Sequence, residues 1–202
     1  MSESNPCLLL KVFAPGREFV LPYIARELAD REVVAVDSLS GCDVAVVNPG
    51  DSVPDGLSVP VLVCPNIVGT GMAGLPMDFA RRIARGSFYH LGGNEARLST
   101  VHATDVAKAV RLSLGSSGTF VVTDGADPTY HDFAEALAWR INHKRILSLN
   151  SRWVKWLINP QLKKIITTDS VVDGSEFAAR FNFRPVPVTE YLRNHVYDDE
   201  SL

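Results

Sequence analysis

The chain has 202 residues, of which 46% are apolar and 21% are charged, and its net charge is −3 at pH 7. This is the composition of an ordinary globular domain that can bury a sizeable core. The slight acidic excess argues against a nucleic-acid-binding domain, which is expected to be basic. The N-terminus lacks a basic segment followed by an apolar core, and no run reaches the ~18 apolar residues of a membrane span. We therefore expect a cytoplasmic protein that contacts neither nucleic acid nor membrane.

Three cysteines, Cys7, Cys42 and Cys64, lie in or beside apolar runs. Their spacing matches neither a CxxC pair nor a zinc site, and the five histidines have no metal-ligand spacing either. We predict buried, reduced thiols and no metal site.

The first elements form a strand, a helix and a second strand. The apolar run from Cys7 to Ala14 predicts a buried strand. Apolar residues at helical spacing predict a helix over Phe19–Ala29, which begins near Leu21 because Pro22 is tolerated only in a first turn. The strand Glu32–Val36 then completes a βαβ unit.

This unit has one feature of a dinucleotide-binding fold and lacks another. Asp37 follows the second strand, where such folds hold the ribose hydroxyls. The three glycine positions of the phosphate-binding loop are filled by proline, glutamate and leucine, and Gly16 is the one glycine present. Gly16 and Asp37 are thus the candidate cofactor contacts. We expect a structural turn and no cofactor, with NAD and NADP disfavoured.

The third strand, Asp43–Asn48, follows closely on the second. Only Ser38–Cys42 separates the two, whereas a parallel crossover needs about a dozen residues or more. The pair is therefore expected to form an antiparallel hairpin, unless the boundary of the second strand is misplaced. The segment from Pro49 to Ser58 is predicted to be a loop because it is rich in Pro, Gly, Asp and Ser.

The middle of the chain has the order of elements that builds a site, since ligands in α/β proteins bind at loops after strands. The predicted elements are the strand Val59–Cys64, a glycine turn over Pro65–Gly71, a helix over Pro76–Arg85, the strand Leu98–His102, and a helix over Val106–Leu114 with Asp105 as its N-cap or first-turn acid.

The remaining elements are shorter towards the C-terminus. They are the strand Thr119–Thr123, a helix over Tyr130–Ile141 capped by Thr129, an extended Ile146–Leu149, helical segments around Pro160, and helices over Ser175–Phe181 and Glu190–His195. We divide the chain into a main domain, 1–143, and a small C-terminal lobe, 144–202, packed on it.

Several motifs in this order resemble the extended short-chain dehydrogenases/reductases, the NAD-dependent nucleotide-sugar epimerases and dehydratases. The turn Pro65-Asn-Ile-Val-Gly-Thr-Gly71 is similar to a family motif, and so is the segment from Gly92 to Ala109 with its Arg and Val-His-Ala-Thr-Asp. The strand and helix over Thr119–Leu137 and the closing element over Phe177–Tyr191 are similar as well. The resemblance implies an α/β fold, a reduced Rossmann-like and mostly parallel sheet flanked by helices, with a small α-rich C-terminal lobe.

The family's catalytic pair, a tyrosine four residues before a lysine, does not occur in this sequence. The family's catalytic helix would lie between the strands that end at Asn48 and begin at Val59, where there is no room for it. Hydride transfer needs an acid/base partner and a bound nicotinamide. We therefore name no catalytic residue, and enzyme activity stays open.

The resemblance places four residues on the substrate side, Asn66, Gly69, Arg97 and His102. Arg97 suits a sugar-nucleotide diphosphate through its bidentate geometry, or is an ordinary surface arginine. Asn66 either contacts a ligand or fixes the turn by bonding its own backbone. His102 is expected to be structural, since it lies beside an apolar strand.

Three functions follow. The first is a degenerate epimerase-like protein without redox catalysis that binds a nucleotide sugar or a protein partner. The second is an active nucleotide-sugar epimerase, dehydratase or reductase with an atypical site. The third is a structural subunit of a larger complex. The sequence does not indicate an oligomeric state.

Overall fold

The computed structural model describes residues 8–54, 56–93, 95–141, 146–149, 163–164 and 166–194. Its main feature is a five-stranded sheet in the order β2-β1-β3-β4-β8, in which every neighbouring pair is parallel. The strands are β1 (Leu8–Phe13), β2 (Arg31–Ala35), β3 (Val44–Val47), β4 (Pro60–Val63) and β8 (Gly118–Val121). The predicted α/β class with a mostly parallel, Rossmann-like sheet is confirmed.

The connection from β1 to β2 starts with a short 3-10 helix, η1 (Glu18–Val20), which continues into α1 (Leu21–Glu27). Pro22 lies in the first turn of α1, as predicted, where its missing N–H costs no helix hydrogen bond. Tyr23 and Ile24 are buried and belong to the core that α1 and α3 form on one face of the sheet.

The predicted hairpin between the second and third strands is wrong. β1 lies between β2 and β3 and is parallel to both, with Leu8 opposite Arg31 and Val12 opposite Val44. Ala35 at the end of β2 and Val44 at the start of β3 both lie opposite Val12, so the connecting residues 36–43 cross over β1, and they do so without a helix. Eight extended residues span up to roughly 26 Å, more than the roughly 10 Å between strands on either side of a third. The minimum crossover length used in the prediction applies to a helical connection.

β3 and β4 are direct neighbours, with Ala45 opposite Val61. Residues 48–59 connect them, and no helix is assigned in the described part of this connection. The outer face of these strands is covered by the loops themselves. Their cluster contains Cys42, Ala45, Val47 and Val61 as buried members, with partly buried loop residues such as Leu39 and Leu57 packed against it.

Two short segments cross from the sheet to the rest of the molecule. β5 (Ile67–Val68) pairs in parallel with β7 (Val101–His102). Helix α3 (Ala103–Ser113) follows β7 directly, three residues before its predicted start. The Nδ1 atom of His102 accepts a hydrogen bond from Thr104 N–H at 3.2 Å, so His102 is the N-cap and Asp105 is a first-turn acid.

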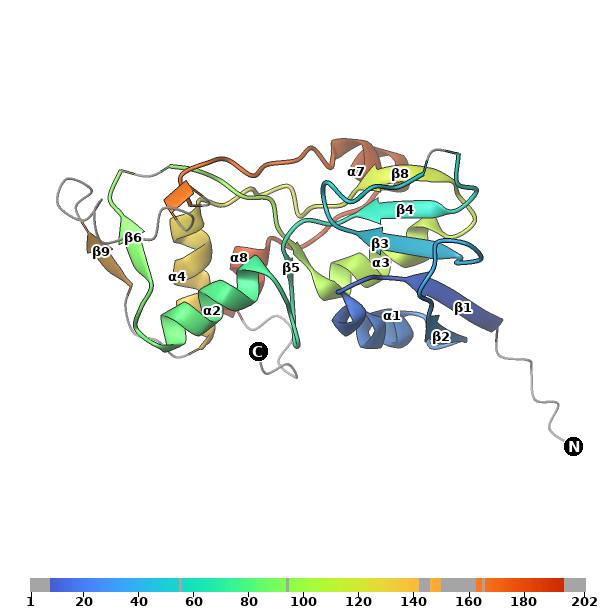
Figure 1. Ribbon diagram of the computed structural model, residues 1–202, viewed down its shortest axis with the longest axis horizontal. Helices are drawn as coiled ribbons and strands as arrows, with labels where there is room; N and C mark the ends of the chain where they lie inside the picture. The colour runs from blue at the N-terminus through green and yellow to red at the C-terminus, as the bar shows by residue number, and fades with distance from the viewer. Residues whose placement is uncertain are drawn as a thin grey trace, which may run out of the picture.

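A helical lobe stands beside the sheet (Figure 1). It contains α2 (Leu75–Ala84), α4 (Tyr130–Arg140), α8 (Val188–Asn194) and the parallel pair β6 (Tyr89–Leu91) and β9 (Leu147–Leu149). Thr129 caps α4 as predicted, since its hydroxyl accepts from Asp132 N–H at 3.1 Å. The lobe contains residues from before and after position 143, because α8 packs against α4. The helical segments predicted around Pro160 lie outside the described residues.

Two buried aspartates tie the C-terminal segment to the rest of the chain. Asp124 accepts from Thr100 Oγ1 and from Val188 N–H, each at 2.8 Å. Asp105 pairs with Lys108 at 2.8 Å and accepts from Val186 N–H at 3.0 Å. Helix α7 (Ser175–Phe181), which coincides with its predicted range, packs on β8 next to this segment.

Candidate functional site

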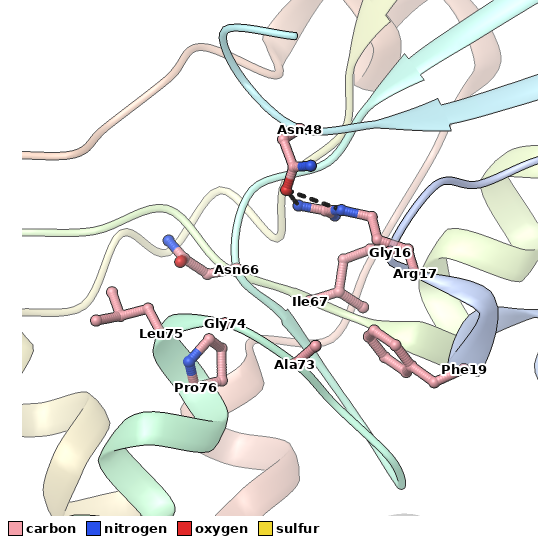
Figure 2. A pocket seen from close by; sticks show the side chains of 10 residues that line it. All are labelled: Gly16, Arg17, Phe19, Asn48, Asn66, Ile67, Ala73, Gly74, Leu75 and Pro76. Carbon is pink, nitrogen blue, oxygen red and sulfur yellow. Dashed lines mark hydrogen bonds between the residues drawn. The ribbon is translucent and has the colours of Figure 1, made fainter.

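A pocket of about 170 Å³ lies between the carboxyl ends of β1 and β3 and the first turn of α2. Ligands in open α/β sheets bind outside the carboxyl ends of the strands. The pocket also lies where the sheet meets the helical lobe (Figure 2). It is lined by Gly16, Arg17, Phe19, Asn48, Asn66, Ile67, Ala73, Gly74, Leu75 and Pro76.

Arg17 is the only cationic residue among those that line this pocket. It follows β1, and its side chain crosses the sheet edge to the ends of β3 and β4. Its Nε donates to Asn48 Oδ1 at 3.0 Å, its Nη2 donates to the same oxygen, and its Nη1 donates to the Cys64 carbonyl at 2.6 Å. Asn48 is itself held by Asp51, which accepts from Asn48 N–H at 2.7 Å. The guanidinium is therefore fixed in position (Figure 2).

The charge of Arg17 is buried but not neutralised by direct contact. The residue is 8% exposed, and burial lowers the pKa of its guanidinium, although Cys64 and Asp51 act in the opposite direction. Within the described part of the chain, no carboxylate forms an ion pair with it. A buried cation whose partners are an amide oxygen and a carbonyl has capacity left for an anion.

The other walls of the pocket also suit an anion. The first turn of α2 has no side-chain cap, so the N–H groups of Leu75 and Met77 are available at the positive end of the helix dipole, whereas Pro76 between them has none. Gly16 has φ +65°, and a Cβ built there meets no atom within 4 Å, so there is open space at this position of the loop. Its N–H already donates to the Glu18 carboxylate at 3.0 Å, so a ligand anion would have to displace this carboxylate.

Two of the residues predicted from the sequence line the pocket, namely Gly16 and Asn66. Asn66 has φ +31°, and its Nδ2 donates to the Ser99 carbonyl at 2.9 Å. The Asn66 side chain thus bonds the backbone of a neighbouring segment rather than its own backbone. Its Oδ1 atom does not accept a hydrogen bond from the turn. Asp37 is exposed in the bend after β2 and does not line the pocket.

Gly69 and His102 lie in the packing behind the pocket. A Cβ on Gly69 would lie 2.8 Å from Tyr23 Oη and 2.9 Å from Ala103 Cβ, so this glycine permits a close approach of β5 to α1 and α3. His102 is 1% exposed and stacks on Tyr191 with ring centroids 3.8 Å apart. Burial, followed by the charge of Lys108, lowers the pKa of His102 to about 3, so its imidazole is neutral at pH 7.

Arg97 lies apart from this pocket. It is exposed, its Nη1 donates to the Asp127 carbonyl at 3.5 Å, and its backbone N–H donates to Asp169 at 2.8 Å. Arg17, Asn48 and the start of α2 line the pocket but were not predicted from the sequence. The available signals were an arginine directly after the first strand and its turn, and an asparagine at the end of the third strand.

The cysteines do not contribute chemistry to the site. Cys42 and Cys64 are buried free thiols, as predicted, and Cys7 lies outside the described residues. Complete burial raises the pKa of Cys64 to about 12. Among the described residues, no cluster of three or more His, Cys, Asp or Glu side chains could hold a metal ion. No helix there is both long and apolar enough to cross a membrane.

Neither a family model nor a curated protein matches the sequence. Solved structures do match. A putative epimerase from Burkholderia cenocepacia covers 94% of this chain and 97% of its own, with a TM-score of 0.61 and 13% identity. UDP-glucose 4-epimerase from Thermotoga maritima, solved with UDP-glucose, covers 91% and 96%, with a TM-score of 0.60 and 15% identity. A human epimerase family protein, solved with NADPH, covers 91% and 98%, with a TM-score of 0.60 and 10% identity.

These likenesses show that the chain has the fold of the NAD(P)-dependent epimerases of the short-chain dehydrogenase/reductase type. The resemblance inferred from the motifs is confirmed at the level of the fold. A conserved protein of unknown function from Silicibacter pomeroyi has this fold too, with a TM-score of 0.63 and 10% identity over 96% of this chain and 99% of its own.

The prediction that no cofactor binds is overturned by these comparisons. The human protein and RMD from Pseudomonas aeruginosa, which has a TM-score of 0.56, are both NADPH complexes. The prediction was based on the missing glycines and on the negative charge of Glu18, and it did not consider Arg17. In the structure, Arg17 supplies positive charge at the sheet edge, and the start of α2 lines the same pocket without a side-chain cap. These residues fit the phosphate part of a nucleotide.

Proposed function

We propose that the chain is a nucleotide-binding protein that takes NAD(P) at the pocket between the sheet and α2. The observation that carries this proposal is Arg17, a fixed and buried cation with no carboxylate partner among the described residues, at the sheet edge where this fold class binds ligands. The pocket volume of about 170 Å³ is below the range of about 300–1,000 Å³ typical of whole-ligand sites. The pocket therefore holds the diphosphate, while the bases extend along the open edge on both sides.

In this proposal each residue has a binding role. Arg17 meets the diphosphate with the part of its guanidinium not directed at Asn48, and the N–H groups at the start of α2 face the same charge. Asn66 contributes its side-chain oxygen to a ribose or to an ordered water. Bound NAD(P) would supply hydride chemistry, as it does in dehydrogenases generally.

We further propose that this chain binds the nucleotide without catalysing redox chemistry. The sequence contains no tyrosine four residues before a lysine, and neither residue type lines the pocket. The nearest candidate, Tyr23, is 7% exposed, and its hydroxyl accepts from Thr70 N–H at 2.6 Å, which fixes it in the packing. A general acid or base must reach the reacting group.

A nucleotide sugar is the second candidate ligand, because the epimerase from Thermotoga maritima with this fold was solved with UDP-glucose. UDP-glucose carries the same diphosphate chemistry as NAD(P). If Arg97 takes part, as the motif resemblance implies, Arg97→Ala weakens UDP-glucose binding and leaves NADPH binding unchanged. Equal effects on both ligands would remove Arg97 from the substrate side.

The proposal is tested by titrating the full chain with NADPH and following NADPH fluorescence. Arg17→Gln should weaken binding at least tenfold, and Arg81→Gln, an exposed arginine on α2 outside the pocket, should leave it unchanged. Circular dichroism confirms that both variants are folded. Unchanged affinity in folded Arg17→Gln would refute the proposal. Turnover of NADPH in the presence of UDP-glucose would refute the absence of redox chemistry.

A further inference from the structure

Strand β2 is an edge strand, with a neighbour on one side only. The order of the sheet places β1 on one side of β2, and no strand of the described part of the chain pairs with the other side (Figure 1). The residues of β2 are partly or fully exposed along its whole length. An edge strand presents unpaired backbone groups to which a further strand can pair. The outer side of β2 is therefore a candidate interaction surface.

The hydrogen bonds of this segment show which backbone groups of β2 point outward. Directly after the strand, the Val36 N–H donates to the Val12 carbonyl of β1 at 2.9 Å. Backbone groups of successive residues in a strand point to alternate sides, so those of Val34 also point to β1, whereas those of Val33 and Ala35 point away from it. Among the described residues, no hydrogen bond reaches the outward groups of Val33 and Ala35.

The side chains around this edge are unusually apolar for an exposed surface. Leu8 is 61% exposed, Leu9 48% and Val34 37%. These are three of the seven exposed large apolar side chains in the described part of the chain, and they lie on the neighbouring strands β1 and β2. Lysine and proline, with which edge strands commonly prevent association, do not occur in β2. A partner strand would remove apolar surface from water.

A second copy of β2 fits this surface in one register. A two-fold axis through Val33 pairs the two copies antiparallel over the whole strand, with Val33 opposite its own copy and Glu32 opposite Val34. Each Val33 N–H then donates to the other copy's Val33 carbonyl, and each Ala35 N–H donates to the other copy's Arg31 carbonyl. An axis through Glu32 would place two like charges directly opposite each other, which is destabilising, and an axis through Val34 would pair residues 33–35 only.

The same register brings together two charges that are unpaired in the single chain. Lys11 of β1 is opposite Val34, which in turn is opposite the other copy's Glu32. Opposite residues point to the same face of a sheet, so the three side chains form one row across three strands. The row is roughly 10 Å long between its outer Cα atoms, which a lysine and a glutamate side chain together can span. Neither Lys11 nor Glu32 forms an ion pair among the described residues.

We propose that the chain forms a symmetric dimer through β2, in which the two sheets join into one continuous sheet. Backbone pairing holds the two edge strands together, and the two Lys11–Glu32 pairs select the register. Val34 of each copy is covered by the other. The surface shares no residue with the Arg17 pocket, so the dimer does not depend on nucleotide binding.

The test is sedimentation equilibrium of the full chain at concentrations up to the millimolar range. We expect a monomer–dimer equilibrium, and the mass of a monomer at every concentration would overturn the proposal. Val33→Pro removes the outward N–H of Val33 and no hydrogen bond to β1, so it is compatible with an edge strand. This variant should dimerise at least tenfold more weakly than the parent. Unchanged dimerisation of Val33→Pro, folded by circular dichroism, would also overturn the proposal.

A charge exchange tests the register. Glu32→Lys and Lys11→Glu each place like charges in the row and should each weaken dimerisation at least tenfold, whereas the double variant should recover at least tenfold over either single variant. Glu176→Lys changes the net charge as Glu32→Lys does but lies on α7, which packs on β8 at the opposite border of the sheet, and should dimerise like the parent. Additive losses in the double variant would overturn the register. The mass of the unmodified chain decides the proposal even if a variant fails to fold, and NADPH binding to the same samples reports separately on the Arg17 pocket.

Discussion

The carboxyl ends and the amino ends of the strands each present one arginine to a pocket, and the fold holds these arginines in opposite ways. Arg17 at the carboxyl edge is 8% exposed and donates to Asn48 and to the Cys64 carbonyl. Arg31 at the amino edge is 31% exposed at its side chain, and its Nε has no hydrogen-bond acceptor among the described residues but lies 3.9 Å from the Asp30 carboxylate. Arg17 therefore has a structural role as well as a place in the pocket, because its guanidinium is buried and held by hydrogen bonds. Arg31 adds little to stability.

The largest expected effect separates the two arginines by stability. Arg17→Met leaves Asn48 Oδ1 and the Cys64 carbonyl without their donor, which should cost about 2–3 kcal/mol of the free energy of unfolding. Arg31→Met removes only the partly exposed ion pair of Nε with Asp30 at 3.9 Å and should stay within about 0.5 kcal/mol of the parent. Urea unfolding of both variants measures the difference. Equal losses would show that the two arginines are not held differently.

Close packing behind the Arg17 pocket gives the next effect. Gly69→Ala places a Cβ 2.8 Å from Tyr23 Oη and 2.9 Å from Ala103 Cβ, and this overpacking should cost about 1–3 kcal/mol. In a Tyr23→Phe background the contact with the hydroxyl disappears, so the same substitution should cost less. A double-mutant cycle in urea measures this coupling. Strictly additive losses would contradict the close approach of β5 to α1.

Burial behind the pocket also predicts a dependence on pH. The folded-state pKa of His102 is lowered to about 3, while the unfolded value is near 6.5. Between these values the unfolded chain binds the extra proton, so stability falls as the pH is lowered from about 6.5 to 3. One such proton contributes a slope of about 1.4 kcal/mol per pH unit.

His102→Asn tests this slope with a matched cap. Asn keeps the N-cap of α3 but does not titrate. Between pH 4 and 6, the free energy of unfolding of the variant should change with pH less steeply than that of the parent, by the amount that one proton contributes. An unchanged slope would mean that His102 is protonated in the fold.

Much of the fold could be predicted because its signals are local. The apolar runs of the sheet, the first-turn Pro22 and the Thr129 cap each act within a few residues, and the predicted elements match. The hairpin and the start of α3 could not be predicted in the same way. The hairpin depended on which strand lies between two others. The start of α3 depended on a histidine side chain that serves as a cap.

The site was harder to predict from the sequence, because its contacts join residues that are far apart in the chain. Gly16 and Asn66 belong to short motifs and were found, whereas Arg17 acquires its meaning only through Asn48 and Cys64, 31 and 47 residues further along. By the glycine pattern alone, the loop after β1 lacks the residues of a phosphate-binding loop. Arg17, the residue after Gly16, nevertheless supplies a positive charge at this position.

The most direct test of the central claim is calorimetric titration of NADPH into the unmodified chain and into Asn48→Asp at equal ionic strength. The substitution gives Arg17 a carboxylate partner and keeps an oxygen acceptor at the position of Asn48 Oδ1, which neutralises the charge available to a diphosphate. It also replaces the Nδ2 donor to Asp51 at 3.0 Å, so circular dichroism is recorded to confirm that the variant is folded. We predict saturable binding to the unmodified chain and at least a tenfold loss, about 1.4 kcal/mol, in the variant. Equal affinity in the two proteins, or no binding to either, would contradict the account.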